Sequence, residues 1–187
     1  MKNAVSMSAD SGTVFLDRDG VINRMRPDYV KRWAEIEFLP GALDAIVKIS
    51  RSGRQVVVLT NQSAIGQNLV SVDTVEAIHR RITALVADRG GQIKAFLLCP
   101  HRRGAGCDCR KPAPGLFWRA RDELGVDLGD AVMIGDQMSD MQAARAAGVK
   151  AILIDPHGAR AKLREREGCA VVADLAAAAE MVCAPND

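Results

Sequence analysis

Short apolar runs alternate along the chain with longer segments whose apolar residues recur at helical spacing. The runs are rich in strand-forming residues, which is typical of buried strands. We expect strands at Thr13–Leu16, Gln55–Thr60, Ala95–Leu98, Ala131–Ile134, Ala151–Ile154 and Val171–Val172. The spacing in the other segments predicts helices at Gly41–Ser50, Val72–Asp88, Pro114–Leu124, Met138–Ala147 and Asp174–Val182.

Strands that alternate with helices and are apolar throughout indicate a parallel sheet covered by helices on both faces. The predicted fold class is therefore α/β, with a doubly wound, Rossmann-like parallel sheet. The chain has 187 residues, of which 48% are hydrophobic, so it can bury a sizeable core. We expect residues 1–12, which are small and polar, to form a flexible lead-in, and residues 13–187 to form a single domain.

The charge and composition exclude some classes of partner. The formal net charge is +2 and the basic residues form no long block, which argues against a nucleic-acid partner. The chain shows no signal peptide and no apolar run near membrane-spanning length, so we expect no membrane partner and a cytoplasmic location. We also expect a monomer. Five cysteines, three of them clustered, favour a metal over disulfides in a reducing compartment.

Polar side chains follow each of the first four predicted strands. In parallel α/β sheets, ligands bind beyond the carboxyl ends of the strands. Carboxylates gathered there would repel one another unless a hard cation such as Mg²⁺ joined them, and a lysine and neutral donors would suit a phosphate ester. The residues concerned are Asp17 and Asp19, then Thr60, Asn61, Gln62 and Ser63, then Arg110 and Lys111, and finally Asp136, Gln137 and Asp140.

Four of these segments together resemble the motifs of the haloacid-dehalogenase (HAD) superfamily phosphatases. The segments are Asp17-Arg-Asp-Gly-Val21, Thr60, Lys111 and Gly135-Asp136 with Asp140, and the match runs from about Thr13 to Ile154. The resemblance implies the HAD fold, an aspartyl-phosphate on Asp17, and Asp19 as the general acid and base. It also implies Mg²⁺ held by Asp17, the backbone carbonyl of Asp19 and Asp136, while Thr60 and Lys111 steady the phosphoryl group. Asp140 would hold Lys111 or the water ligands of the metal.

A cluster of soft ligands precedes Lys111. Three thiols and one imidazole make a full tetrahedral set for a structural Zn²⁺, which would clamp the loop 99–109 and fix where Arg110 and Lys111 point. The alternative is that these groups are free thiols and a surface imidazole. The four residues are Cys99, His101, Cys107 and Cys109.

The zinc loop also resembles that of two families of small phosphatases with a minimal cap, the heptose bisphosphate 7-phosphatases and the histidinol-phosphatases. Resemblance to the first, which Thr60–Gly66 also favours, implies removal of the 7-phosphate from a heptose 1,7-bisphosphate in nucleotide-activated heptose biosynthesis. The short span from His101 to Cys107 is similar to the second. Arg110 would bind the remote phosphate. The other implied substrate contacts are Asp28, Tyr29, Asn61, Gln62, Ser63 and Gln137.

Simpler interpretations exist for several of these residues. The Asp17-Arg-Asp19-Gly segment alone is also typical of a turn, and Asp136 could be the N-cap of the following helix. A catalytically silent, zinc-stabilised module that binds phosphorylated ligands is a further alternative. His79 neighbours Arg80 and Arg81, so we expect it on a solvated helix face.

Overall fold

The computed structural model describes residues 12–158 and 168–184. In this part of the chain six parallel strands form one sheet in the order β3-β2-β1-β4-β5-β6. The strands are β1 (Thr13–Leu16), β2 (Gln55–Asn61), β3 (Ala95–Cys99), β4 (Val132–Gly135), β5 (Lys150–Ile154) and β6 (Ala170–Val172). Each lies within two residues of its predicted bounds, and the predicted fold class is confirmed.

The predicted helices are present with small shifts at their ends. They are α1 (Ala42–Arg51), α3 (Val72–Asp88), α4 (Gly115–Leu124), α5 (Met138–Ala146) and α7 (Leu175–Cys183). Two short elements were not predicted, the 3₁₀ helix η1 (Trp33–Glu35) and α2 (Ser63–Gly66). Neither is long enough to produce a periodic apolar pattern, which is the signal that revealed the longer helices.

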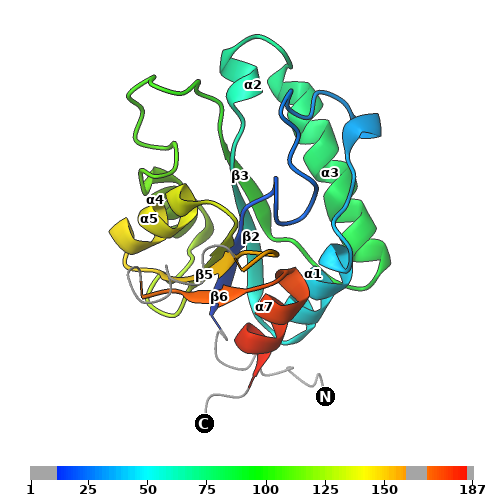
Figure 1. The fold of residues 1–187 in the computed structure, drawn as a ribbon, viewed down its shortest axis with the longest axis vertical. Coiled ribbons are helices and arrows are strands. Elements are labelled where there is room, and N and C mark those ends of the chain that lie inside the picture. The colour runs from blue at the N-terminus through cyan, green and yellow to red at the C-terminus, as the bar shows by residue number, and fades with distance from the viewer. Residues whose placement is uncertain (1–11, 159–167, 185–187) are drawn as a thin grey trace, which may run out of the picture.

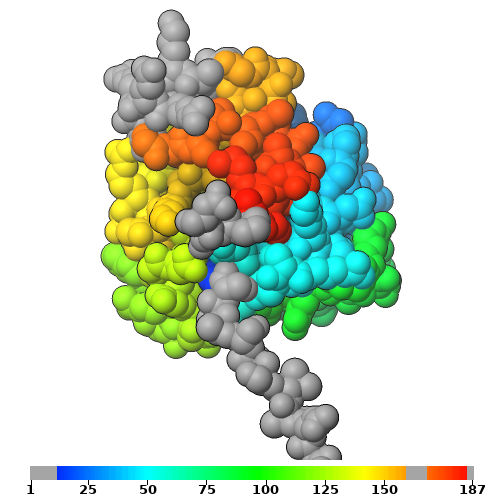
Figure 2. Space-filling model, turned by 90° about the horizontal axis from the view of Figure 1, so that it is seen from below, coloured from blue at the N-terminus to red at the C-terminus, as the bar shows by residue number. Residues whose placement is uncertain are grey.

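Helices cover both faces of the sheet, and the side chains of β1 pack alternately against the helices on each face. Val14 and Leu16 belong to the apolar cluster under α1, α3 and α7, whereas Phe15 belongs to the cluster under α4 and α5. Phe15 meets Phe117 of α4 edge to face at 5.0 Å. Because strand side chains alternate between faces, a fully apolar strand is what a two-sided core requires. Figure 1 shows the two helical layers, and Figure 2 shows α7 beside α1 at the end away from α2.

The strand order determines at which edge of the sheet the predicted site residues meet. β1 is paired with β2 on one side and with β4 on the other, and β3 pairs with the far side of β2. All these pairings are parallel, so the carboxyl ends of four adjacent strands meet at one edge of the sheet, near α2 in Figure 1. This is the edge at which doubly wound folds bind ligands.

The flexible lead-in predicted for residues 1–12 lies outside the described residues except for Gly12, whose carbonyl accepts a hydrogen bond from Gln55 N. Within residues 12–158 and 168–184, no helix combines the length and the apolar character needed to cross a bilayer.

Candidate active site

A cleft of about 310 Å³ opens at the carboxyl ends of β1 and β2. Its lining brings together residues from five separate segments of the chain, as the sheet order requires. Of the predicted site residues, the lining contains Asp17, Asp19, Tyr29, Thr60, Asn61, Gln62, Ser63, Arg110, Lys111, Gln137 and Asp140.

Lys111 and two carboxylates form a buried cluster at the base of the cleft. Lys111 Nζ lies 2.9 Å from Asp17 Oδ1 and 2.6 Å from Asp140 Oδ1, and it also donates to the Leu59 carbonyl. Burial alone would lower the pKa of Lys111, but the charges of Asp140 and Asp17 outweigh it and raise that pKa. For Asp17, burial raises the pKa to about 7 despite the lysine, and Asp140 and Asp19 add to the shift. One lysine therefore does not balance the acids around it.

The acids fit a divalent cation. Carboxylate oxygens of Asp17, Asp136 and Asp140 all lie within 4.8 Å of one another. Burial raises the pKa of Asp136 to about 6, so ionising these groups together is unfavourable without further positive charge. Mg²⁺ accepts such ligands and would supply that charge. Both Asp140 oxygens accept hydrogen bonds, Oδ1 from Lys111 Nζ and Oδ2 from Gln137 N. Lys111 contacts Asp17 only through Oδ1, and the Gln137 side chain contacts Asp136 only through Oδ2, so Asp17 and Asp136 are the better ligands.

Gly20 allows Asp136 to approach the turn after β1. The backbone of Gly20 has a φ of +96°, and a Cβ there would lie 2.5 Å from Asp136 Cγ. Glycine is thus required both by the backbone and by the space. Asp136 is not the N-cap of α5, as one interpretation had it, because the N-cap is Gln137, whose side chain donates to Asp136 Oδ2 at 2.7 Å. The Asp136 carboxylate stays beside the cleft instead of closing the helix.

Asp19 is held by hydrogen bonds from three side chains. Arg18 donates to both carboxylate oxygens at 3.0 and 2.8 Å, Asn23 donates at 2.9 Å, and Gln62 donates at 2.9 Å. Burial would raise the pKa of Asp19, but the Arg18 charge and these hydrogen bonds outweigh it and lower that pKa. The Asp19 side chain keeps 22% exposure, so it can still meet a group that enters the cleft.

The end of β2 supplies neutral polar groups. Thr60 Oγ1 accepts from Gln62 Nε2 at 2.8 Å, which leaves the threonine O–H able to donate into the cleft. Asn61 forms a reciprocal pair with the Lys111 backbone, donating to its carbonyl at 3.0 Å and accepting from its N–H at 3.1 Å. Asn61 therefore fixes the main chain on which Lys111 stands.

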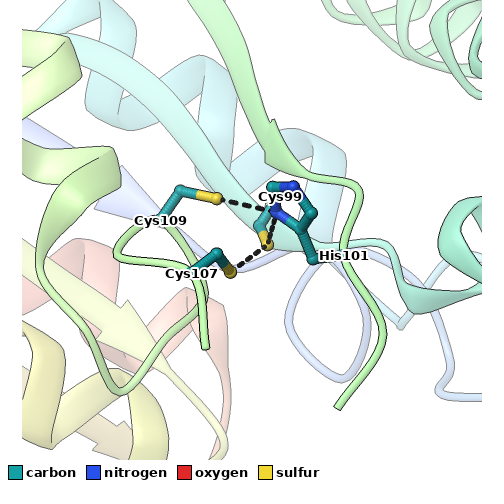
Figure 3. Close-up of side chains that lie close together, drawn as sticks. All are labelled: Cys99, His101, Cys107 and Cys109. Carbon is teal, nitrogen blue, oxygen red and sulfur yellow. Dashed lines mark hydrogen bonds between the residues drawn. The ribbon is translucent and has the colours of Figure 1, made fainter. Parts of the chain in front are cut away.

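The predicted zinc ligands come together with spacings close to those of a metal site. Cys99 Sγ lies 3.6 Å from His101 Nδ1 and 3.7 Å from Cys107 Sγ, and His101 Nδ1 lies 3.2 Å from Cys109 Sγ (Figure 3). Zn–S bonds of about 2.3 Å in a tetrahedron place neighbouring sulfurs about 3.8 Å apart, so the geometry fits Zn²⁺. Burial raises the pKa of Cys109 to about 12, and ligation would be needed to make that thiol a thiolate.

The loop that carries this cluster also carries Arg110. The Arg110 guanidinium donates to Ser63 Oγ at 2.7 Å and to the His101 carbonyl at 3.3 Å, so a predicted zinc ligand and the start of α2 both hold it at the cleft.

The two predicted substrate contacts Asp28 and Tyr29 lie in different places relative to the cleft. Tyr29 lines the cleft, and its hydroxyl accepts from Gln67 Nε2 at 2.9 Å. Asp28 is not among the lining residues, and its carboxylate pairs with Arg26 at 3.1 Å and Lys31 at 2.8 Å. The structure therefore does not bring Asp28 to the cleft.

Two residues at the site escaped the sequence analysis. The expectation of a solvated face for His79 was wrong, because its side chain is buried, stacks on Phe96 at 4.2 Å and contacts Arg18. Arg18 is 1% exposed, and the sequence analysis gave it no role. The helical spacing could have indicated that His79 is buried, because it lies three positions from Ile82 and four from Val75 on the buried face of α3.

Comparisons with known proteins agree with this geometry. A family model described as HAD-hydrolase-like matches residues 108–178. A D-glycero-β-D-manno-heptose-1,7-bisphosphate 7-phosphatase of Pseudomonas aeruginosa is 39% identical over 168 residues, which cover 89% of this chain and 94% of that protein. An enzyme of Mycobacterium tuberculosis named for the α anomer is 42% identical over 134 residues, which cover 70% of each chain.

A solved structure extends the likeness to three dimensions. The crystal structure of D,D-heptose 1,7-bisphosphate phosphatase from Bordetella bronchiseptica, complexed with magnesium and phosphate, superposes with a TM-score of 0.84. It is 37% identical, and the match covers 91% of this chain and 97% of that one. The chain therefore belongs to the HAD-like hydrolases, in the family of the D-glycero-D-manno-heptose-1,7-bisphosphate 7-phosphatases.

Proposed function

We propose that this protein is a Mg²⁺-dependent phosphatase that removes the 7-phosphate from a D-glycero-D-manno-heptose 1,7-bisphosphate. The observation that carries the proposal is the Asp17 carboxylate, buried at the end of β1, paired with Lys111 and within 4.8 Å of Asp136. A nucleophile and a cation for the phosphate thus line one small cleft, and a metal ligand lies beside it. This arrangement suits phosphoryl transfer, in which positioning and charge do most of the work.

The first half-reaction forms a covalent intermediate. An Asp17 oxygen attacks phosphorus, the bond from phosphorus to the sugar oxygen breaks, and Asp19 gives its proton to that oxygen. The pKa of Asp19 is lowered in the free protein, but the negative phosphate disfavours the charged carboxylate beside it. Substrate binding itself therefore promotes the acid form that this step needs.

The second half-reaction restores the protein. Water attacks the phosphorus of the aspartyl-phosphate, Asp19 takes the water proton, and Asp17 leaves as a carboxylate with release of inorganic phosphate. Lys111 and the Thr60 hydroxyl donate to the phosphoryl oxygens in both steps. Asp17, Asp136 and the Asp19 carbonyl would hold Mg²⁺, which would supply positive charge beside the phosphoryl group.

The remote end of the substrate would meet Arg110, whose planar guanidinium suits the second phosphate. We assign Tyr29, Asn61, Gln62, Ser63 and Gln137 to the walls around the sugar, because they line the same cleft. Asp28 is not part of this proposal. The cytoplasmic location, the monomeric state, the absence of nucleic-acid and membrane partners, and the place in nucleotide-activated heptose synthesis stay predictions.

Phosphate release tests the proposal directly. kcat/KM would be measured with and without Mg²⁺ for both anomers of heptose 1,7-bisphosphate and for histidinol phosphate. We expect a Mg²⁺-dependent preference for a heptose bisphosphate, lost in Asp17→Asn. A preference for histidinol phosphate would reassign the substrate, and no release from any of the three would favour the silent binding module.

A further inference from the structure

Arg18 is a buried cation at the wall of the cleft, and only 1% of it is exposed. Its Nη2 donates to both oxygens of Asp19 and to Gln62 Oε1 at 3.2 Å, and its Nη1 lies 3.2 Å from His79 Nε2. Within the described residues, Arg18 Nε has no hydrogen-bond partner. The guanidinium is therefore anchored through its two terminal nitrogens, with the carboxylate on one and the imidazole on the other.

The His79 side chain accepts a hydrogen bond from the Arg18 guanidinium. Arginine is a donor only, so Nε2 of His79 must carry the lone pair and Nδ1 the proton. Burial lowers the pKa of His79 to about 3, with a smaller contribution from Arg18, so the imidazole is neutral at physiological pH. The ring stacks on Phe96 at 4.2 Å with an interplanar angle of 14°, which fixes the direction of Nε2.

We propose that His79 is a positioning residue for the general acid, acting through Arg18 to align the Asp19 carboxyl with the leaving-group oxygen. This inference rests on the proposed function, in which Asp19 transfers the proton. Without an acceptor at position 79, both Nη1 and Nε of Arg18 would be buried without partners. The guanidinium would then turn toward other acceptors or water, and the paired contact with both Asp19 oxygens would be lost.

Two substitutions separate this role from simple packing. His79→Phe keeps a ring to stack on Phe96 but removes the acceptor, whereas His79→Gln can restore an acceptor near the position of Nε2. Arg80→Gln is the matched control, since Arg80 is the next residue on α3 and its side chain is 69% exposed.

The test compares kcat/KM for two substrates whose leaving groups differ in their need for a proton. An alkoxide needs the proton from Asp19, whereas p-nitrophenolate is stable without it. We expect His79→Phe to lower kcat/KM for heptose 1,7-bisphosphate by about 10- to 100-fold, part of the range for general acid catalysis, and for p-nitrophenyl phosphate by less than about 3-fold. We expect His79→Gln to stay within about 3-fold of wild type on both, and Arg80→Gln to leave the ratio unchanged.

The ratio of the two kcat/KM values within one preparation does not depend on how much of the variant is folded. Equal losses on both substrates in His79→Phe would reduce His79 to a structural role, and a wild-type ratio with full activity would overturn the proposal. Both outcomes require an active wild-type enzyme. A wild type that releases no phosphate would instead refute the proposed function.

Discussion

Gly20→Ala tests whether Asp136 depends on its close approach to the turn after β1. The new Cβ would overlap Asp136 Oδ2 and lie 2.5 Å from Cγ, whereas an ordinary contact begins at 3.4 Å, so the carboxylate must retreat by at least about 1 Å. A misplacement of about 1 Å at a reacting centre can cost about 100-fold in rate. We expect kcat/KM to fall by about that factor and the Mg²⁺ concentration for half-maximal activity to rise.

Gly41→Ala is the control for the free-energy cost of placing an alanine at a positive φ, because it adds that cost without a steric clash. Gly41 has a φ of +71°, but a Cβ there would meet nothing within 4 Å. Each alanine should cost about 1–2 kcal/mol of stability for the positive φ, which lowers Tm by about 2–8 °C in a domain of this size. Only Gly20→Ala should also weaken the response to Mg²⁺.

The assay is phosphate release over a Mg²⁺ titration, with Tm measured for both variants. Wild-type kcat/KM and an unchanged Mg²⁺ requirement in Gly20→Ala would refute the reasoning, because Asp136 could then move without consequence.

Three further predictions follow from the same cleft. Asp17→Asn should lower phosphate release by at least about 10³-fold with little change in Tm, and a wild-type rate would exclude Asp17 as nucleophile. Folding raises the pKa of Asp17 to about 7 and that of Asp136 to about 6, from 3.8 in the unfolded chain. Their contribution to the stability of the metal-free protein is therefore fully present below pH 3.8 and is lost as the pH rises through about 6 to 7. Mg²⁺, which binds the ionised groups, should therefore raise Tm more at about pH 8 than at about pH 5 in thermal melts, and an equal gain would contradict this linkage. Cys109→Ser should lower the zinc content and Tm, and should raise KM for the bisphosphate by about 10-fold through Arg110; unchanged metal content would remove the zinc assignment.

The periodic elements were predictable because their signals are local. Val72–Asp88 was predicted with the bounds that α3 has, and β1 likewise, since apolar spacing and β-branched runs need no knowledge of the rest of the chain. The strand order was not predicted, although the expectation that strand ends share one edge required only that the strands be parallel. That single assumption brought Asp17, Thr60 and Lys111 together.

Two features depend on contacts between side chains that the pattern of the sequence does not show. Asp28 was predicted to contact the substrate, whereas in the structure it pairs with Arg26 and Lys31 and is not among the residues that line the cleft. His79 was expected in solvent because its neighbours are arginines, yet the face of α3 on which it lies is set by Val75 and Ile82. A polar residue on an apolar stripe indicates a buried partner, and here the partner is 61 positions away.

Charge balance at the base of the cleft ties these observations together. Four carboxylates meet two cations there, so the ionised site carries an excess of two negative charges, which one divalent cation would neutralise. Each cation has its own acids: Arg18 serves Asp19, whereas Lys111 is shared by Asp17 and Asp140. The two aspartates of the first motif thereby acquire different chemistry two residues apart. In the proposed mechanism, Asp19, which pairs with Arg18, transfers the proton. Asp17, which shares Lys111 with Asp140, keeps an oxygen for the metal and the phosphorus.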